Sequence, residues 1–439
     1  MSIADKLRGA IADTRPLQEP HFRRLWTAGI ITMIGAQLTV VAVPAQIYAD
    51  TGSSAYVGLT GVFGLVPLIV FGLYGGALAD HFDRRTILMV STTGLIVTSA
   101  LFWLQSALGN TNVWALLCLF SVQQAFFAVN QPTRNSLLPK ILPAHLLPAA
   151  NSLNMTVFQA GAIAGPLVAG VMLPFTGFTW LYAIDTVTLF ATLYAVVLLP
   201  RIPVEGAGSK VPGLRSVWDG FAYLRHQPVL LMSFVVDLIA MVFAMPRALF
   251  PQIAHESFGG PTEGGIAFAL LFAAIPAGAV IGGIFSGWVS RIEAQGRVVI
   301  WCIGVWALGI TLFGLTVAFA DHLTPLMLGL GVLFMMVAGA ADVASAAIRM
   351  SMLQSAADDN VRGRLQGVFT VVVAGGPRVA DVLHGGAAAV VGTAIATTGG
   401  GLLNLLGIAL CALLVPSFLA YRVNRTAPEG LLLVHEGTK

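Results

Sequence analysis

Seven ionisable side chains lie inside long apolar stretches of this 439-residue sequence. Such groups are costly in an apolar environment unless they are paired or hydrated, so in membrane proteins they mark ion and substrate pathways. The acids among them are candidates for binding and releasing a proton: Asp185, Asp237, Asp342 and Asp381. The basic residues are candidates for contacting a substrate or providing a counter-charge: Arg247, Arg378 and His384.

Two hypotheses can explain these charges. Arg378 and Asp381 are three residues apart, so they share a helix face and can pair, and His384 follows on that face. In one hypothesis, Asp237 or Asp342 is protonated and deprotonated during transport while Arg378 is a counter-charge. In the alternative, the charges form static pairs that only hold helices together.

Other polar side chains in the apolar stretches also have two possible roles. Asp185 either titrates or caps a packing contact, and Arg247 either attracts an anionic substrate or reaches the outer lipid headgroups. Five amides either hydrogen-bond a polar substrate without fixing its charge or bond neighbouring helices to each other. These amides are Gln37, Gln46, Gln123, Gln124 and Asn130.

The apolar stretches themselves predict a membrane protein. Hydrophobic residues make up 57% of the sequence and charged residues only 10%, whereas soluble domains carry about 25% charged residues. A membrane-spanning helix needs about 20 apolar residues. Twelve such stretches are present, at 25–49, 57–79, 86–108, 112–134, 149–173, 178–199, 228–250, 265–289, 298–319, 325–348, 365–390 and 399–421. The predicted fold class is an all-α membrane protein with twelve transmembrane helices.

The basic residues fall on one side of this predicted topology. With the amino terminus inside, every Lys and Arg except Arg247 and Arg378 lies in a segment assigned to the cytoplasm. Loops assigned to the outside contain none. Because Lys and Arg favour cytoplasmic loops, both termini are predicted to be cytoplasmic.

The two halves of the chain repeat each other. Gly165-Pro166 recurs as Gly376-Pro377, and Arg134 recurs as Arg349, at nearly the same separation. This indicates a duplicated six-helix unit, and two such units around a central site are typical of secondary transporters. The predicted organisation is a cytoplasmic segment 1–24, a six-helix bundle 25–199, a linker 200–227, a six-helix bundle 228–421 and a tail 422–439.

The linker contains apolar residues at three- and four-residue steps. They predict an amphipathic helix on the cytoplasmic membrane surface, and a flexible linker is the alternative. These residues are Leu214, Val217, Trp218, Phe221 and Leu224.

The most distinctive stretch, GGALADHFDRR, separates the second and third apolar runs. Gly76 lets another helix approach closely, and Asp80 can face the positive end of a neighbouring helix. Arg84 and Arg85 can close ion pairs on the inner face. The alternative is that these arginines only hold the loop inside.

This stretch resembles the loop motif between spans two and three of the major facilitator superfamily. The resemblance implies that Gly76, Asp80, Arg84 and Arg85 lock the two halves together when the cavity faces outward. His81 and Asp83 replace the usual basic residue and glycine, so Asp83 partly neutralises the arginines.

Within the superfamily the chain resembles the enterobactin-exporter and drug:proton antiporter branch, from about residue 20 to 421. The resemblance rests on VAVPAQIYADTGSSAYVGL, AAIPAGAVIG and MLQSAADDNVRGRLQGV. It implies the fold of that superfamily, alternating access, a monomer and a bacterial inner membrane location.

The fifth apolar run contains GAIAGPLVAG, which resembles the helix motif that the superfamily associates with antiporters. The resemblance implies export through Gly161, Gly165, Pro166 and Gly170, and ordinary close packing is the alternative. Span one lacks the acid, and span four lacks the mid-span arginine, that many superfamily antiporters carry. Proton coupling is therefore expected in the second half or at Asp185.

The predicted function is secondary active export of a siderophore-like or amphipathic drug-like small molecule, driven by proton antiport. Multidrug efflux of lipophilic cations and a lipid or lysolipid flippase are the alternatives. The sequence contains no P-loop, nucleophile turn or metal-ligand cluster, which argues against an enzyme, a cofactor or a metal. Basic residues spread along one membrane face argue against nucleic-acid binding. The expected partners are the substrate, protons and the lipid bilayer.

Overall fold

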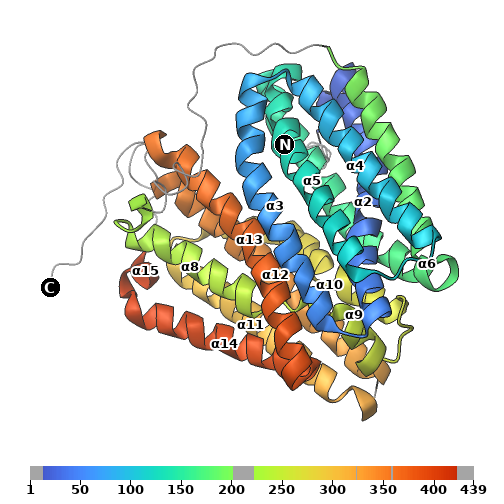
Figure 1. Cartoon of the computed structure of the whole chain (residues 1–439). Coiled ribbons are helices and arrows are strands. Elements are labelled where there is room, and N and C mark those ends of the chain that lie inside the picture. Colours follow the sequence, from blue (N-terminus) through green and yellow to red (C-terminus); the bar gives the residue numbers. More distant parts are fainter. Residues whose placement is uncertain (1–12, 201–221, 323, 357–358, 423–439) are drawn as a thin grey trace, which may run out of the picture.

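The computed structural model describes residues 13–422, apart from 201–221, 323 and 357–358, and it leaves the side chains of 73–81, 290, 322 and 354–371 undescribed. Every regular element in the described part is helical (Figure 1). The predicted amphipathic helix at 214–225 falls largely outside this part.

The first half of the chain folds into long helices that follow the predicted spans. Its elements are η1 Arg15–Gln18, α2 Pro20–Thr51, α3 Ser54–His81, α4 Arg84–Ala107, α5 Val113–Ile141, η2 Ala144–Leu146 and α6 Leu147–Val197. The helix α6 bends at Gly177, whose φ of 68° and ψ of 179° interrupt the helical backbone. Glycine adopts this conformation without the steric cost of a side chain. The bent helix therefore covers the two spans predicted at 149–173 and 178–199.

The second half is more broken near its start. The predicted span 228–250 is helical as α8 only over Pro228–Phe243, and the chain then continues past Pro246. Proline lacks the backbone N–H that a continuing helix needs. Short turns follow as η3 Arg247–Leu249, α9 Phe250–Gln252 and the π-helical turn η4 Ile253–Ser257.

The remaining helices of this half again follow the apolar runs. They are α10 Ile266–Ile284, η5 Ser286–Arg291, α11 Gln295–Ala318, η6 Ala320–His322, α12 Thr324–Ala356, α13 Asp359–Val391, α14 Thr393–Leu414 and α15 Pro416–Ala420. Among the described residues, ten segments are long and apolar enough to cross a membrane. One of them, Ala144–Val197, covers two predicted spans, and α13 is not among the ten. The all-α membrane fold is confirmed, and the count of twelve spans stays a prediction.

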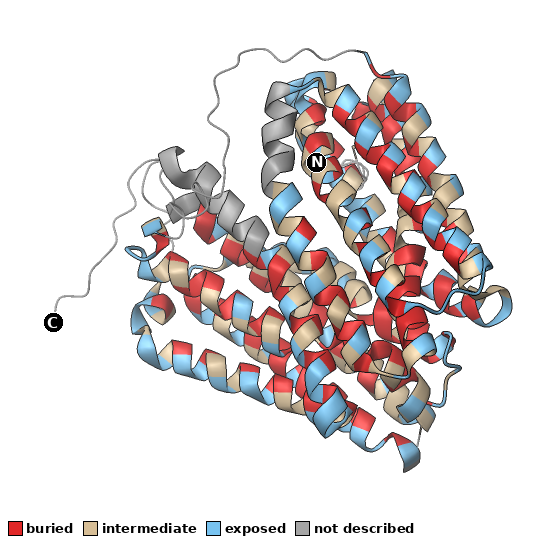
Figure 2. Ribbon diagram, viewed as in Figure 1, coloured by how far each residue is buried: buried red, intermediate tan, exposed pale blue. Residues whose placement is uncertain are grey.

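Apolar side chains cover the outside of the molecule as well as its interior. On α14 one face is buried against other helices, whereas the other face is exposed (Figure 2). A helix that is apolar on both faces is expected where lipid replaces water. The exposed leucines of α14 are Leu402, Leu403, Leu406, Leu410, Leu413 and Leu414.

Two long helix pairs connect the first half to the second. The helix α3 packs on α13, and α6 packs on α10. The ribbons of α3 and α13 lie together near α9 and diverge toward the end where α3 finishes and α13 begins (Figure 1). The predicted topology places the joined end outside and the diverging end in the cytoplasm.

Candidate functional site

The first contact between the halves lies where α3 and α13 cross without side chains between them. A Cβ atom added to Gly58 would lie 2.6 Å from the Asp381 carbonyl oxygen, and one added to Gly61 would collide with the Arg378 carbonyl oxygen. On α13, Gly385 lies against the backbone of α3 in the same way. Glycines allow two helix backbones to approach this closely. We call the interface between the two halves the seam, and this end of the seam is therefore shut.

The second contact joins α6 to the start of α10. The Gly265 N–H donates a hydrogen bond of 3.0 Å to the Gly170 carbonyl oxygen, so the two halves share a backbone bond. Gly170 belongs to the predicted antiporter motif, and it is the member that faces the other half. The other two glycines of the motif, Gly161 and Gly165, pack against Met33 and Gln37 of α2. The motif thus packs α6 tightly against α2 within the first half and against α10 of the other half.

Polar side chains close the same end of the seam. The Tyr48 hydroxyl of α2 donates a 2.9 Å hydrogen bond to the Glu256 carboxylate of η4. The Ser54 hydroxyl of α3 donates one of 2.6 Å to the Gln252 side-chain oxygen, and Gln252 in turn donates to Glu256 at 2.8 Å. These bonds link the first half to the turns that follow α8. We call Tyr48, Ser54, Gln252 and Glu256 the latch.

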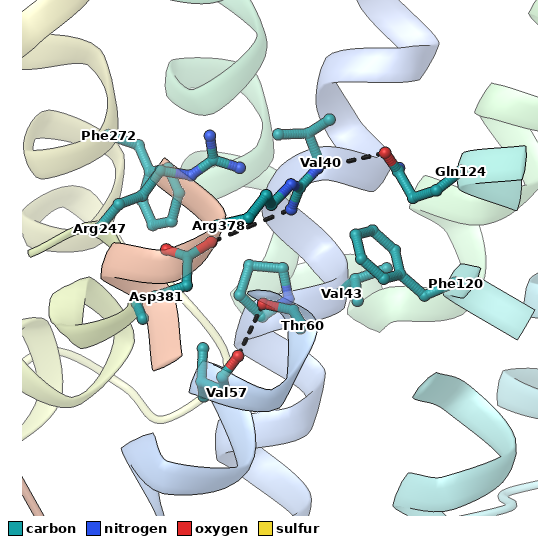
Figure 3. Close-up of a pocket in the computed structure, with 12 residues that line it drawn as sticks. Val40, Val43, Val57, Thr60, Phe120, Gln124, Arg247, Phe272, Arg378 and Asp381 are labelled. Carbon is teal, nitrogen blue, oxygen red and sulfur yellow. Dashed lines mark hydrogen bonds and ion pairs between the residues drawn. The ribbon is translucent and has the colours of Figure 1, made fainter. Parts of the chain in front are cut away.

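Just inside the latch, a small pocket lies at the seam (Figure 3). Arg378 reaches across the seam and donates a 3.2 Å hydrogen bond to the Gln124 side-chain oxygen of α5. Its guanidinium lies 4.0 Å from the Asp381 carboxylate and 5.4 Å from the centre of the Phe120 ring. Arg247 lines the same pocket. The structure therefore brings these predicted residues together.

The volume and charge of this pocket limit what it holds in this conformation. It encloses about 30 Å³, which accommodates ordered water but not a ligand that needs about 300 Å³ or more. The described lining residues carry two arginines and one aspartate, with Phe120 and Phe272 beside them. The pocket is therefore small, positively charged and partly aromatic in this conformation.

A second charged cluster lies within the second half. Arg349 of α12 is 6% exposed, and its guanidinium lies 2.5 Å from the Asp237 carboxylate of α8. It also lies 3.9 Å from the Asp342 carboxylate and donates to the Ser345 hydroxyl at 3.2 Å. In the hypothesis from the sequence, Arg378 was the counter-charge while one of these acids titrated. Arg378 faces the seam pocket, and Arg349 pairs with both acids.

Asp185 stands apart from both clusters, inside the first half. Its carboxylate is 2% exposed and accepts hydrogen bonds from the Thr39 hydroxyl of α2 at 2.7 Å and the Ser99 hydroxyl of α4 at 2.8 Å. Both bonds reach Oδ2, and Oδ1 has no hydrogen-bond partner. Among the described residues, only hydroxyl groups are placed to compensate the charge of an ionised carboxylate here.

The remaining candidates have local partners. His384 lies 3.1 Å from the Phe243 carbonyl oxygen, and Asn130 donates to the Ser91 and Thr92 hydroxyls at 2.9 and 3.1 Å. Gln123 is buried. These contacts match the structural alternative stated for the amides, whereas Gln124 faces the pocket.

The predicted gating motif is only partly described. Gly76 and Asp80 belong to α3, but their side chains lie outside the described residues. The Asp83 carboxylate caps α4 by accepting from the Arg85 N–H at 3.1 Å, and the Arg85 guanidinium donates to the Val197 carbonyl oxygen at 2.6 Å. Arg84 is half-buried beside them. Arg85 and Asp83 thus tie the start of α4 to the end of α6.

Comparisons with known proteins agree with this architecture. A nucleoside transporter, NupG, superposes with a TM-score of 0.68 at 14% identity, covering 91% of this chain and 98% of its own. A bacterial homologue of the human lysosomal transporter Spinster, in an inward-facing and unoccupied conformation, gives a TM-score of 0.70 at 15% identity, covering 93% and 99%. These similarities support the transporter fold.

Proteins similar in sequence identify the family of this chain more specifically than these structures do. The chain is 26% identical over 411 residues to the enterobactin exporter EntS of Shigella boydii, covering 93% of this chain and 95% of that protein. EntS of Escherichia coli O81 matches at the same identity and coverage. The family model described as transmembrane secretion effector matches residues 11–428. The chain therefore belongs to the transmembrane secretion effector family and is a membrane transporter of the major facilitator superfamily.

Proposed function

We propose that this protein exports an anionic, aromatic small molecule of the catecholate siderophore class across the bacterial inner membrane. Export proceeds by alternating access, driven by protons that enter the cell, with both termini in the cytoplasm. The observation that carries the proposal is the seam pocket, where Arg247 and Arg378 face a single acid, Asp381, beside two phenylalanines.

The pocket suits such a substrate for physical reasons. A planar guanidinium binds an oxyanion through more than one N–H group, and it also stacks on aromatic rings. Arg378 already lies over the Phe120 ring at 5.4 Å, so a catechol ring entering here meets both a charge and an aromatic wall. The similarity to enterobactin exporters favours the same class of substrate.

The shut end of the seam supports alternating access. The glycine crossings and the latch hold α3 on α13 and α6 on α10 at the predicted outer end. A substrate bound at the seam leaves on that side only after these contacts separate. The contacts are backbone approaches and a few hydrogen bonds, so the halves can separate as rigid bodies.

One observation favours a second candidate, the efflux of lipophilic cations. Asp342 has a side chain that is 31% exposed, and it contacts Arg349 only at 3.9 Å. A cation could compete with Arg349 for this carboxylate. The pocket at the seam, with more positive than negative groups, disfavours a cation, and for this reason we place it second.

Transport in proteoliposomes tests the proposal. The purified protein is offered an iron-free catecholate siderophore, a lipophilic cationic dye or a labelled lysolipid, each with and without an imposed pH gradient. We expect gradient-dependent movement of the siderophore. Movement of the dye alone would favour the second candidate, and movement of the lysolipid alone would favour a flippase. Siderophore movement at the same rate with and without the pH gradient would contradict proton antiport.

A variant pair tests the role of the pocket. Arg378→Gln removes the charge but keeps a polar side chain, and we expect it to raise the siderophore KM by about tenfold, the loss of one charge-assisted hydrogen bond. Gln123→Leu, in the same helix as Gln124 but outside the pocket lining, is the control and should leave KM unchanged. An unchanged KM in Arg378→Gln would contradict binding at the pocket.

A further inference from the structure

A row of buried polar side chains runs through the first half of the molecule. It lies where α6 packs on α2 and on α4. On α2 the row uses Thr32, Thr39, Gln46 and Asp50, which recur on one face of the helix. Polar side chains inside a bundle of apolar helices carry a cost that function usually explains.

The outer part of the row is centred on Gln46. Its side-chain oxygen accepts a 2.9 Å hydrogen bond from the Tyr182 hydroxyl and a 3.2 Å bond from the Gln105 amide. Asp50, one turn further along α2 and exposed at the predicted outer end, interacts with the Gln46 side chain. The Gln105 oxygen is buried and has no hydrogen-bond partner. Buried polar atoms of this kind are normally satisfied by ordered water.

The central part of the row is Asp185, one turn after Tyr182 on α6. Thr39 and Ser99 both donate to Oδ2, which leaves Oδ1 as a second buried atom without a partner. The titratable groups that face this region are Tyr182 on α6 and Asp50 on α2, and α4 contributes only neutral groups. Among the described residues, no ion pair involves Asp185. No described cation therefore opposes a negative charge on its carboxylate.

The inner part of the row continues toward the predicted cytoplasmic end. The Thr188 hydroxyl donates to the Asp185 carbonyl oxygen at 2.9 Å. Thr32 donates to the Thr188 carbonyl oxygen at 3.1 Å, and its hydroxyl lies 2.6 Å from that of Thr192. Polar groups therefore extend on both sides of Asp185 along the bundle.

We propose that Asp185 is the proton-carrying residue of the transport cycle, and that the proton reaches it from the Asp50 end along this row. The inference rests on the proposed proton antiport and assigns it to one site. Oδ1 accepts the proton, and the Thr39 and Ser99 hydroxyls stabilise the carboxylate after the proton leaves. A proton suits the site better than a metal cation, because the described residues contain no group of three or more His, Cys, Asp or Glu side chains that could hold a metal ion.

The helix α2 connects this site to the substrate pocket. One side of α2 presents Thr39 and Gln46 to the polar row, while Val40, Val43 and Pro44 line the seam pocket. The fit between α2 and α6 is tight at Asp185, since a Cβ atom on Gly35 would lie 2.8 Å from the Asp185 Cα atom. A change of charge at Asp185 thus acts on the helix that forms one wall of the substrate pocket.

The test compares variants of full-length protein in proteoliposomes loaded with the catecholate probe. A pH gradient, a sodium gradient or no gradient is imposed, and both probe movement and internal pH are recorded. Asp185→Asn is expected to lose gradient-driven movement and probe-linked proton flow, while it keeps probe binding and exchange of probe without a gradient. Asp342→Asn is the rival variant and should keep its dependence on the pH gradient, whatever its rate.

Two milder variants guard against failure of Asp185→Asn to fold. Ser99→Ala and Thr39→Val each remove one hydroxyl that stabilises the ionised carboxylate, so the proton is released only at higher pH. The pH at which transport is half-maximal should therefore move upward in both. A packing role alone would lower the amount of folded protein without moving this midpoint.

The possible failures are distinguishable. Coupling that persists in Asp185→Asn, or midpoints that do not move in the milder variants, would overturn this inference and leave proton antiport standing. Coupling lost in Asp342→Asn instead would transfer the role to the second half. Wild-type movement that follows the sodium gradient alone, or no gradient, would overturn both the inference and proton antiport.

Discussion

At the scale of single residues, the arginine that repeats in the two halves, Arg134 and Arg349, has different partners in each half. Arg349 is buried against Asp237 and Asp342. Its counterpart Arg134 donates instead to the Leu25 carbonyl oxygen at 3.1 Å, and its guanidinium lies against Gly29. Both halves thus carry the arginine, but only in the second half do acidic side chains lie beside it among the described residues. This asymmetry places the shortest and most buried ion pair of the described part inside the second bundle.

The pairing of Arg349 makes a stability prediction. Arg349→Ala leaves Asp237 buried without its partner, and breaking a buried pair in this way costs about 3 kcal/mol. We expect a clearly lower midpoint of thermal unfolding in detergent. The control is Arg15→Ala, which removes an exposed arginine from its 2.6 Å contact with Asp13 and should leave the midpoint unchanged, because exposed pairs contribute little.

A double-mutant cycle tests whether the pair itself is responsible. The loss of stability in the double variant Asp237→Asn, Arg349→Gln should be smaller than the sum of the losses in the two single variants. Each single variant leaves a buried charge at one of these two positions without its partner, whereas the double variant removes both charges. Additive costs would contradict the direct pairing of Asp237 and Arg349.

The sequence identified the buried acids but not their ion-pair partner, Arg349. The predicted span 325–348 ended just before Arg349, whereas α12 continues to Ala356 and takes Arg349 into the bundle. The spacing of Asp342, Ser345 and Arg349 already places them on one helix face. That Arg378 faces the seam depends on how α13 packs on α3, which no local pattern contains.

At the scale of elements, the positions of the long helices along the chain were more predictable than their ends. Long apolar runs specify helices in a membrane because each backbone polar group must be satisfied within the segment. The break after Phe243 was not predicted, although Pro246 was visible as its cause. The crossings of α3 with α13 and of α6 with α10 join segments distant in sequence, so glycine spacing alone indicated close contact without identifying the partner.

The crossing of α3 and α13 makes a conformational prediction. In Gly61→Ala the new methyl group collides with the Arg378 carbonyl oxygen, so the shut end of the seam should open more often. Val57, fully buried on the same helix, would then be reached from outside. In Val57→Cys protein that lacks the native cysteines, Gly61→Ala should speed labelling by a membrane-impermeant maleimide.

A control for this prediction lies on the same helix. A Cβ atom on Gly72 meets no atom within 4 Å, so Gly72→Ala should leave the labelling rate of Val57→Cys unchanged. Equal rates in the two alanine variants would contradict the idea that the glycine crossing holds this end shut.

At the scale of the whole molecule, the contacts described between the halves lie toward one end. The glycine crossings, the latch and the seam pocket all belong to the predicted outer end. An exporter with this architecture must exchange that closure for one at the opposite end. The buried polar row and the Arg349 cluster each lie within one half, so they can persist while the halves rock.

The most direct test measures distances across both ends of the same protein. Spin labels are attached to cysteines at exposed outer positions Thr111 and Thr262, or at exposed inner positions Ala144 and Arg291, after replacement of Cys118, Cys302 and Cys411. With the catecholate probe and varied pH, alternating access predicts that the distance between the two outer labels lengthens as the distance between the two inner labels shortens. A single, unchanging distance at both ends during active transport would contradict it.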